Sequence, residues 1–176
     1  MPRITLIIVS CILSVAAFSQ KSKIIFPRLL SLRIEVGGQD NSLPMIRLNS
    51  DDKLQISFDD LTHEYTRYSY HIEHLGTDFQ PSTHPFEQDY VYSAQETQPI
   101  DNYAESRNTH TNYTHYTIDF PNEDMRPLLS GNYRLLIDYE DEEGERQQAA
   151  VVYFYVLDLK VSIALMPTTN TDIDYN

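Results

Sequence analysis

Residues 120–157, FPNEDMRPLLSGNYRLLIDYEDEEGERQQAAVVYFYVL, decide the fold of this chain. From Tyr133 to Tyr139 large apolar residues recur at every second position, which is the period of a β-strand with one buried face. Residues 140–145 are acidic and contain one glycine, so they suit a hairpin connection. The returning residues, 149–157, are all apolar or aromatic, which is typical of a strand covered on both faces. The stretch therefore predicts a β-hairpin inside an all-β domain.

The turn before the first strand of this hairpin, residues 129–133, reads LSGNY. A tyrosine that enters the penultimate strand of a β-sandwich often forms a hydrogen bond through its hydroxyl back to the preceding turn. Gly131 would allow the tight bend that such a corner needs. We therefore predict a tyrosine corner at Tyr133.

Alternation of apolar and polar residues predicts several further strands, at 32–36, 44–48, 54–58, 65–75, 90–92 and 116–120. Pro44 should confine its strand to an edge or a strand start. With the hairpin the count is about seven strands, which is the number expected of an immunoglobulin- or fibronectin-III-like β-sandwich. Residues 76–109 otherwise lack periodicity, and a loop of this length is either functional or pinned by its own aromatic residues. We predict one β-sandwich domain over residues 21–158.

The two ends of the chain differ from this domain. Residues 1–20 combine a basic start at Arg3, an apolar run and small residues, which predicts a secretory signal peptide cleaved near Ser19 or Gln20. Cys11 lies in the middle of the apolar run. We therefore interpret it as an ordinary residue of this run and not as the lipidated cysteine of a lipoprotein. Alternation returns in residues 159–165, so residues 159–176 are predicted to begin a second domain or a linker.

The composition excludes several functions. The chain carries 26 acidic against 13 basic residues and a formal net charge of −13, so it should repel nucleic acid and anionic lipid. Its one cysteine, Cys11, belongs to the predicted signal, which leaves no disulfide framework and no thiolate chemistry. No segment after the signal is long and apolar enough to span a bilayer.

The histidines and the paired aspartates are the candidate metal ligands in this sequence. His71 and His74 are three residues apart on one predicted strand, so they point to opposite faces and cannot share an ion. The acidic pairs at 51–52 and 59–60 could offer oxygen ligands to Ca²⁺, but no calcium-loop motif is present and both positions suit turns. Residues 140–145 suit a solvated hairpin tip better than a cation site. We predict no metal site and no cofactor.

Motifs for catalysis are also missing from the sequence. It contains no nucleophile elbow, phosphate loop or catalytic cysteine. None of its carboxylates stands in an apolar context that would raise the pKa into the range of a general acid. We therefore predict no catalytic residues and no enzyme activity.

An ordered series of short motifs resembles the first domain of the plug protein of the type IX secretion system. The motifs are PMIRL (44–48), DDKLQISFDDL (51–61), YSYHI (68–72), DFQPS (78–82), SRNT (106–109), HY (115–116), FPNEDM (120–125) and LSGNY (129–133). Together they extend over roughly residues 32–158. Phe79 stands where the family usually has Trp, and family members continue into further domain sequence.

This resemblance implies a β-sandwich first domain and a non-enzymatic protein of the periplasm, associated with the outer membrane. The implied partner is the outer-membrane translocon β-barrel, whose pore the protein would block until a substrate arrives. The alternatives are an exported sugar-binding or adhesive sandwich module, for which the tyrosine-rich residues 90–116 are the candidate surface, and an accessory domain of a hydrolase.

The last predicted strand leads to one further expectation. Its two faces are both apolar: Ala149, Val151, Tyr153, Tyr155 and Leu157 form one, and Ala150, Val152, Phe154 and Val156 form the other. A lone sandwich needs only one of these faces for its core. We expect an exposed apolar patch and self-association, relieved by Phe154→Lys, unless residues 76–109 cover the strand.

Overall fold

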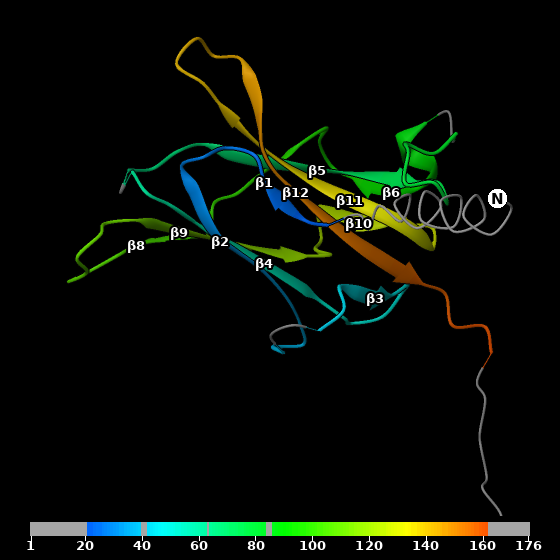
Figure 1. Cartoon of the computed structure of the whole chain (residues 1–176). Helices are drawn as coiled ribbons and strands as arrows, with labels where there is room; N and C mark the ends of the chain where they lie inside the picture. The colour runs from blue at the N-terminus through cyan, green and yellow to red at the C-terminus, as the bar shows by residue number, and fades with distance from the viewer. Residues whose placement is uncertain (1–20, 40–41, 63, 84–85, 162–176) are drawn as a thin grey trace, which may run out of the picture.

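The computed structural model of the chain describes residues 21–39, 42–62, 64–83 and 86–161. Within these ranges it contains strands, one short 3-10 helix, η1 (Glu87–Asp89), and no α-helix, so the all-β prediction is confirmed (Figure 1). The strands are β1 (Lys23–Ile24), β2 (Leu29–Val36), β3 (Met45–Arg47), β4 (Leu54–Asp60), β5 (Tyr68–Leu75), β6 (Val91–Ser93), β7 (Gln98–Pro99), β8 (Tyr103–Glu105), β9 (Thr114–Phe120), β10 (Met125–Pro127), β11 (Gly131–Glu140) and β12 (Arg146–Leu157).

The described strands form three sheets. The first has the order β1-β12-β11-β5-β7, with β3 paired to β12 in parallel at the edge, as Pro44 predicts. The second has the order β2-β4-β9-β8, and the third is a ribbon of β10 and β6. The predicted immunoglobulin-like arrangement of about seven strands is not confirmed, because the described chain has twelve, half of them only two or three residues long. The immunoglobulin-like topology stays a prediction.

The predicted hairpin is confirmed as β11 and β12, and its tip extends beyond the sheets (Figure 1). The Asp141 carboxylate accepts hydrogen bonds from the backbone N–H groups of Glu143 and Glu145, at 3.0 and 2.9 Å. Gly144 has a φ of +80°, a conformation that glycine adopts without strain. The tip is therefore an ordered turn, and its side chains are exposed or half-buried.

The two large sheets pack face to face through aromatic side chains. At one end Phe154 of β12 meets Phe120 of β9, with ring centroids 5.2 Å apart. At the other end Tyr68 of β5 meets Phe58 and Tyr116 of the second sheet at 5.2 and 4.9 Å. All five rings have an exposed fraction of 0%. The core of the domain thus lies between these sheets.

The position of Phe154 corrects the expectation for the last strand. Its ring is stacked on Tyr133 in the core, so Phe154→Lys would place a charge inside the sandwich. The other face of β12 carries the half-buried Tyr153 and Tyr155, and Phe79 approaches both rings edge-on at 6.4 and 6.5 Å. Phe79 belongs to residues 76–109, so part of the predicted long loop does cover the strand. Self-association stays a prediction.

Two other expectations change. The strand predicted at 90–92 is confirmed as β6, but residues 76–109 contain more structure than expected, since η1, β7 and β8 also lie there. Strands β6, β7 and β8 pair with β10, β5 and β9 respectively. Residues 159–161 are exposed and form no strand, whereas a strand was expected to begin there. The remainder of that expected strand and the predicted signal peptide, residues 1–20, lie outside the described residues.

Candidate interaction surface

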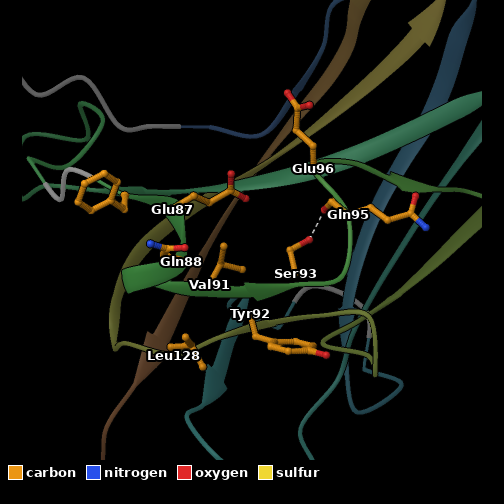
Figure 2. Close-up of a pocket in the computed structure, with 9 residues that line it drawn as sticks. Glu87, Gln88, Val91, Tyr92, Ser93, Gln95, Glu96 and Leu128 are labelled. Atoms are coloured by element: carbon orange, nitrogen blue, oxygen red, sulfur yellow. Dashed lines mark hydrogen bonds between the residues drawn. The ribbon is translucent and has the colours of Figure 1, made fainter.

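A groove of about 510 Å³ lies where η1, β6 and the turn after β6 meet. Except for Leu128, its lining residues fall within residues 76–109, where the sequence predicts a long loop interrupted by a strand at 90–92. Figure 2 shows Val91 and Ser93 on one side of β6 and Tyr92 on the other, as the alternation of a strand requires. All three residues of β6 line the groove, together with residues that precede and follow this strand.

The ribbon of β6 and β10 is anchored by the side chains that it buries. Val91, Met125 and Pro127 are buried, whereas Tyr92 and Arg126 are exposed. On β10 the order is buried, exposed, buried, and on β6 Val91 is buried, Tyr92 exposed and Ser93 half-buried, so one face of the ribbon packs against the sandwich. Because each strand has only three residues, periodicity in the sequence barely signals the pairing.

The tyrosine corner also supports the groove, and its prediction is confirmed. The Tyr133 hydroxyl lies 2.9 Å from the backbone oxygen of Leu129 and 3.1 Å from that of Tyr90. Burial raises the pKa of Tyr133 well above its usual value, so the hydroxyl keeps its proton. The corner therefore joins the start of β11 to the residue that precedes β6.

Three large apolar side chains at the groove are exposed to solvent. Phe86, Tyr92 and Leu128 have exposed fractions of 60%, 43% and 43%. The guanidinium of Arg126, opposite Tyr92 in the ribbon, lies 4.2 Å from the centre of the Tyr92 ring. Tyrosine and arginine are residue types that carry much of the binding energy at protein interfaces. This arrangement can bind a partner protein.

The charge at the groove is negative. Glu87 and Glu96 both line it, and neither has an ion-pair partner among the described residues. Partial desolvation raises the pKa of Glu87; the charges of Glu96 and Glu73 act in the same direction, while His71 opposes them. Carboxylates without an ion-pair partner favour a partner protein with positive charge.

Three of the four paired aspartates that could serve as calcium ligands contact basic side chains of the protein instead. Asp52 accepts hydrogen bonds from the Arg47 side chain at 2.7 and 2.8 Å. Asp59 lies 2.6 Å from Nδ1 of His115. Asp60 is fully buried and forms an ion pair with Arg28 at 2.9 Å.

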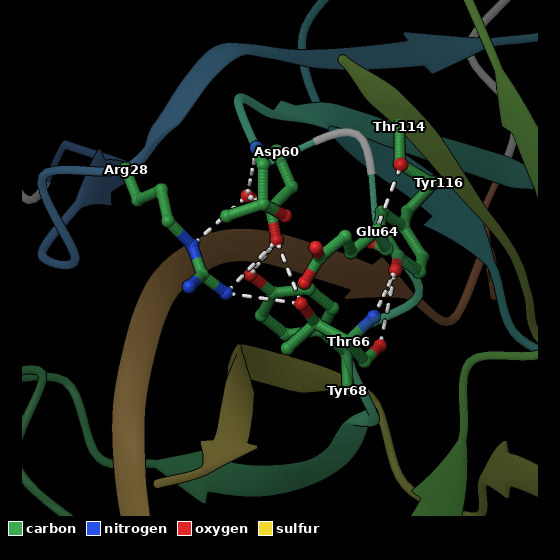
Figure 3. Close-up of polar contacts among 8 residues, drawn as sticks. Arg28, Asp60, Glu64, Thr66, Tyr68, Thr114 and Tyr116 are labelled. Atoms are coloured by element: carbon green, nitrogen blue, oxygen red, sulfur yellow. Dashed lines mark hydrogen bonds and ion pairs between the residues drawn. The ribbon is translucent and has the colours of Figure 1, made fainter. Parts of the chain in front are cut away.

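Figure 3 shows the cluster around Asp60. One carboxylate oxygen accepts hydrogen bonds from the hydroxyls of Thr66 and Tyr68 at 3.0 and 2.9 Å, and burial raises the pKa of Tyr68. The other oxygen accepts bonds from the backbone N–H and hydroxyl of Thr62. With all its acceptors occupied, Asp60 joins the chain before β2 to β4 and β5 and serves the fold. Periodicity could not reveal this cluster, because Arg28 is 32 residues away from Asp60 in the sequence.

The two neighbouring histidines lie on opposite faces of β5, as predicted. His71 is 3.3 Å from an oxygen of Asp138 on the outer face, whereas the His74 ring packs edge-on against Tyr133 inside the sandwich. Over residues 21–161, apart from the undescribed positions, no three His, Cys, Asp or Glu side chains gather at metal-binding distance. Likewise, none of the helical residues that the structure describes could form a membrane-crossing helix.

Comparisons with known proteins agree with this architecture. Residues 29–158 match the model of the family described as type 9 secretion system plug protein 1st domain. A crystal structure of a hypothetical protein from Parabacteroides merdae ATCC 43184 is similar, with 29% sequence identity and a TM-score of 0.71. The similarity covers 78% of this chain but 34% of that one, so this chain spans about a third of its length. No curated protein matches. The chain belongs to the family of the type 9 secretion system plug protein 1st domain.

Proposed function

We propose that this domain helps to plug the outer-membrane pore of the type IX secretion system, through protein–protein contacts made on the periplasmic side. The match of residues 29–158 to the plug-protein family carries this proposal. The predicted signal peptide supports export to the periplasm. No reaction and no cofactor are part of the proposed role, and the partner is the translocon β-barrel.

The groove beside β6 is the surface that we assign to the translocon. Its exposed Phe86, Tyr92 and Leu128 supply apolar contact area, and Arg126 holds the Tyr92 ring in place from one side. An anchored aromatic ring loses little conformational freedom on binding, which favours its use as a contact residue.

Capture of the translocon from detergent-solubilised outer membranes tests the assignment. Tyr92→Ala should weaken capture by the chain, since loss of an aromatic hot spot costs ~2 kcal/mol, roughly thirtyfold in affinity. Tyr103→Ala is the matched control, because Tyr103 is 44% exposed against 43% for Tyr92 but lies on β8. If Tyr92→Ala and Tyr103→Ala captured the translocon equally well, the contact surface would not be the groove beside β6. Failure of the unaltered chain to capture the barrel would overturn the function.

The plugging role needs its own measurement. Cells that lack the chain should admit a large fluorescent dye through the outer membrane, and expression of the unaltered chain should restore the barrier. Capture of the translocon without any change in dye entry would show docking without plugging, and would limit the role to assembly of the complex.

A second candidate function, binding of a sugar, is favoured by a different pair of residues. Tyr65 and Tyr103 are 49% and 44% exposed, and their ring centroids lie 4.9 Å apart. Exposed aromatic faces can stack on the apolar face of a sugar ring. Under this function Tyr103→Ala would abolish binding to a glycan array, whereas Tyr92→Ala would leave it unchanged.

A further inference from the structure

The outer face of the second sheet, β2-β4-β9-β8, contains a hollow of about 300 Å³. On β4 every second residue is buried in the core of the sandwich, so Gln55, Ser57 and Asp59 between them face outward. On β9 the same alternation turns His115 and Thr117 outward. The hollow thus lies on the polar face of the sheet, and it shares no lining residue with the groove beside β6.

The hollow forms because the middle row of this face has short side chains. Ser57 lies opposite Thr117 of β9 in this row. The row on one side of it pairs Asp59 with His115, and the row on the other side contains Gln55. A row of short side chains between two rows of longer ones leaves a depression. Its volume is at the lower end of those typical of sites for small ligands.

Two contacts hold the longer side chains in place. Nδ1 of His115 lies 2.6 Å from one carboxylate oxygen of Asp59. The side-chain amide of Gln55 donates a hydrogen bond to the Asp119 carboxylate at 3.1 Å. Within the described part of the chain, these contacts leave the second oxygen of Asp59 and Nε2 of His115 for a ligand. Side chains that are already positioned lose little conformational freedom on binding.

Arg33 adds hydrogen-bond donors at the edge of the hollow. It lies on β2 opposite Ser57 and is exposed. Its guanidinium forms neither an ion pair nor a hydrogen bond with any residue that the structure describes, whereas Arg28, Arg47 and Arg134 are each paired with a carboxylate. A guanidinium carries five N–H donors in one plane, so it can bond two neighbouring oxygens of one ligand.

The charges around the hollow favour a neutral ligand. Besides Arg33, the carboxylates of Glu35 and Asp59 line it. An anion would be repelled by these carboxylates and by the formal net charge of −13 on the chain, whereas a cation would have to lie beside the Arg33 guanidinium. A neutral ligand with several hydroxyl groups avoids both costs, because each hydroxyl can donate to a carboxylate or accept from the guanidinium.

Tyr113 indicates that this hydroxylated ligand is a sugar. The residue lines the hollow, is half-buried and belongs to the tyrosine-rich residues 90–116. An aromatic ring offers a flat apolar surface on which the apolar face of a sugar ring can stack. Neighbouring hydroxyls of a sugar also match the paired N–H groups of Arg33.

From these observations we infer that the hollow on the outer face of the second sheet binds a neutral sugar, with Arg33 and Asp59 as its main hydrogen-bonding residues. The inference does not depend on the plugging role. The site is also separate from the pair of Tyr65 and Tyr103. Tyr103 lies opposite the buried Tyr116, and the centroids of these two rings are 5.9 Å apart, so Tyr103 is on the core side of the sheet.

NMR titration of the isotope-labelled chain tests the site directly. The probes are neutral trisaccharides of glucose, galactose, mannose and N-acetylglucosamine, at millimolar concentration. At least one of them should shift the amide signals of Ser57, Asp59 and Thr117. Binding of the N-acetylglucosamine probe alone would indicate cell-wall strands as the source of the sugar, and binding of the other probes would indicate glycans carried by proteins or lipids.

Two outcomes of this titration would overturn the inference. In the first, none of the neutral probes shifts any signal of the hollow. In the second, the shifts centre on Tyr65 and Tyr103, which would assign the sugar to that pair.

A variant of Arg33 tests the proposed contacts. Arg33→Met should weaken binding of the sugar about tenfold, the usual effect of losing a hydrogen bond to a charged group. Arg67→Met is the matched control, because Arg67 is also exposed but directly precedes β5 of the first sheet. Equal affinities of the two variants would overturn the assignment of Arg33.

Filling the hollow and charging the sugar test its shape and its preference for a neutral ligand. Ser57→Leu places a larger side chain in the middle row and should abolish binding. A trisaccharide of glucuronic acid should bind more weakly than the neutral probes. Unchanged binding by Ser57→Leu would overturn the site, and equal or tighter binding of the acidic sugar would overturn the neutral ligand. Circular dichroism must show that the variants are folded; if Ser57→Leu is not, Arg33→Met and the acidic sugar decide.

Discussion

The Tyr133 hydroxyl lies 2.9 Å from the backbone oxygen of Leu129, four residues earlier in the chain. The same hydroxyl lies 3.1 Å from the backbone oxygen of Tyr90, so one side chain holds both the entry to β11 and the approach to β6. The ring itself is fully buried against Phe154. A corner that stabilises the sandwich thus also positions the candidate interaction surface.

Removal of this hydroxyl should destabilise the domain. We expect Tyr133→Phe to lower the free energy of unfolding by about 1 kcal/mol, the usual contribution of one hydrogen bond. Urea denaturation measures the change, and Tyr103→Phe, on an exposed ring, is the control. An unchanged midpoint in Tyr133→Phe would show that the corner contributes nothing to stability.

Breaking the ion pair of Arg28 with the buried Asp60 should destabilise the domain more than Tyr133→Phe does. Arg28→Met leaves the Asp60 carboxylate buried without its cationic partner. We expect this change to lower the free energy of unfolding by about 3 kcal/mol. This value is at the lower end for buried ion pairs because the Arg28 side chain is partly exposed. Thr62, Thr66 and Tyr68 still donate hydrogen bonds to Asp60. In a double-mutant cycle, Arg28→Met with Asp60→Asn should cost less than the sum of the single changes. If the losses of stability in the two single variants simply added up in the double variant, Arg28 and Asp60 would not be energetically coupled.

Acid should remove the contribution of the Arg47–Asp52 pair. Hydrogen bonds from the Arg47 side chain, and then from its backbone N–H, lower the pKa of Asp52 below its usual value. The stabilisation is therefore complete above the pKa of an unfolded aspartate, about 3.9, and is lost as the pH falls through the lower folded pKa. Asp52→Asn should be less stable than the unaltered chain at neutral pH, and thermal midpoints should converge in strong acid. A difference in thermal midpoint between the two proteins that stays constant with pH would show that the Arg47–Asp52 pair does not contribute to stability.

Loss of Phe79 should expose the outer face of β12. Phe79 holds a φ of +59° while its ring meets Tyr153 and Tyr155. We expect Phe79→Ala to increase self-association in sedimentation velocity, because two aromatic side chains lose their cover. Adding Tyr155→Lys should return self-association to the level of the unaltered chain. If Phe79→Ala sediments like the unaltered chain, the outer face of β12 does not drive self-association.

Signal cleavage should leave the first sheet intact. Ser22 Oγ accepts a hydrogen bond from Tyr153 N–H at 2.9 Å, and β1 pairs with β12 directly after it. Mass spectrometry of the periplasmic protein should therefore give an N-terminus near Gln20 or Lys21. A lipidated Cys11 at the N-terminus would contradict this cleavage.

The local structural features of this protein follow from the sequence alone. The hairpin of β11 and β12 follows from period-two alternation around an acidic turn, and the Tyr133 corner follows from a bend only a few residues long. The order of short motifs also identified the family. These features depend on neighbours in the chain, whose spacing the sequence records.

Which surfaces face one another depends on contacts between distant segments, and these are visible only in the folded structure. Both faces of β12 are apolar, so alternation could not tell that Phe154 enters the core while Tyr155 meets Phe79 outside it. The pairing of β6 with β10 joins two three-residue strands that lie more than thirty residues apart, too short for a periodic signal. Their position is set by packing against the sandwich and by the Tyr133 hydroxyl, which are contacts between segments distant in the chain.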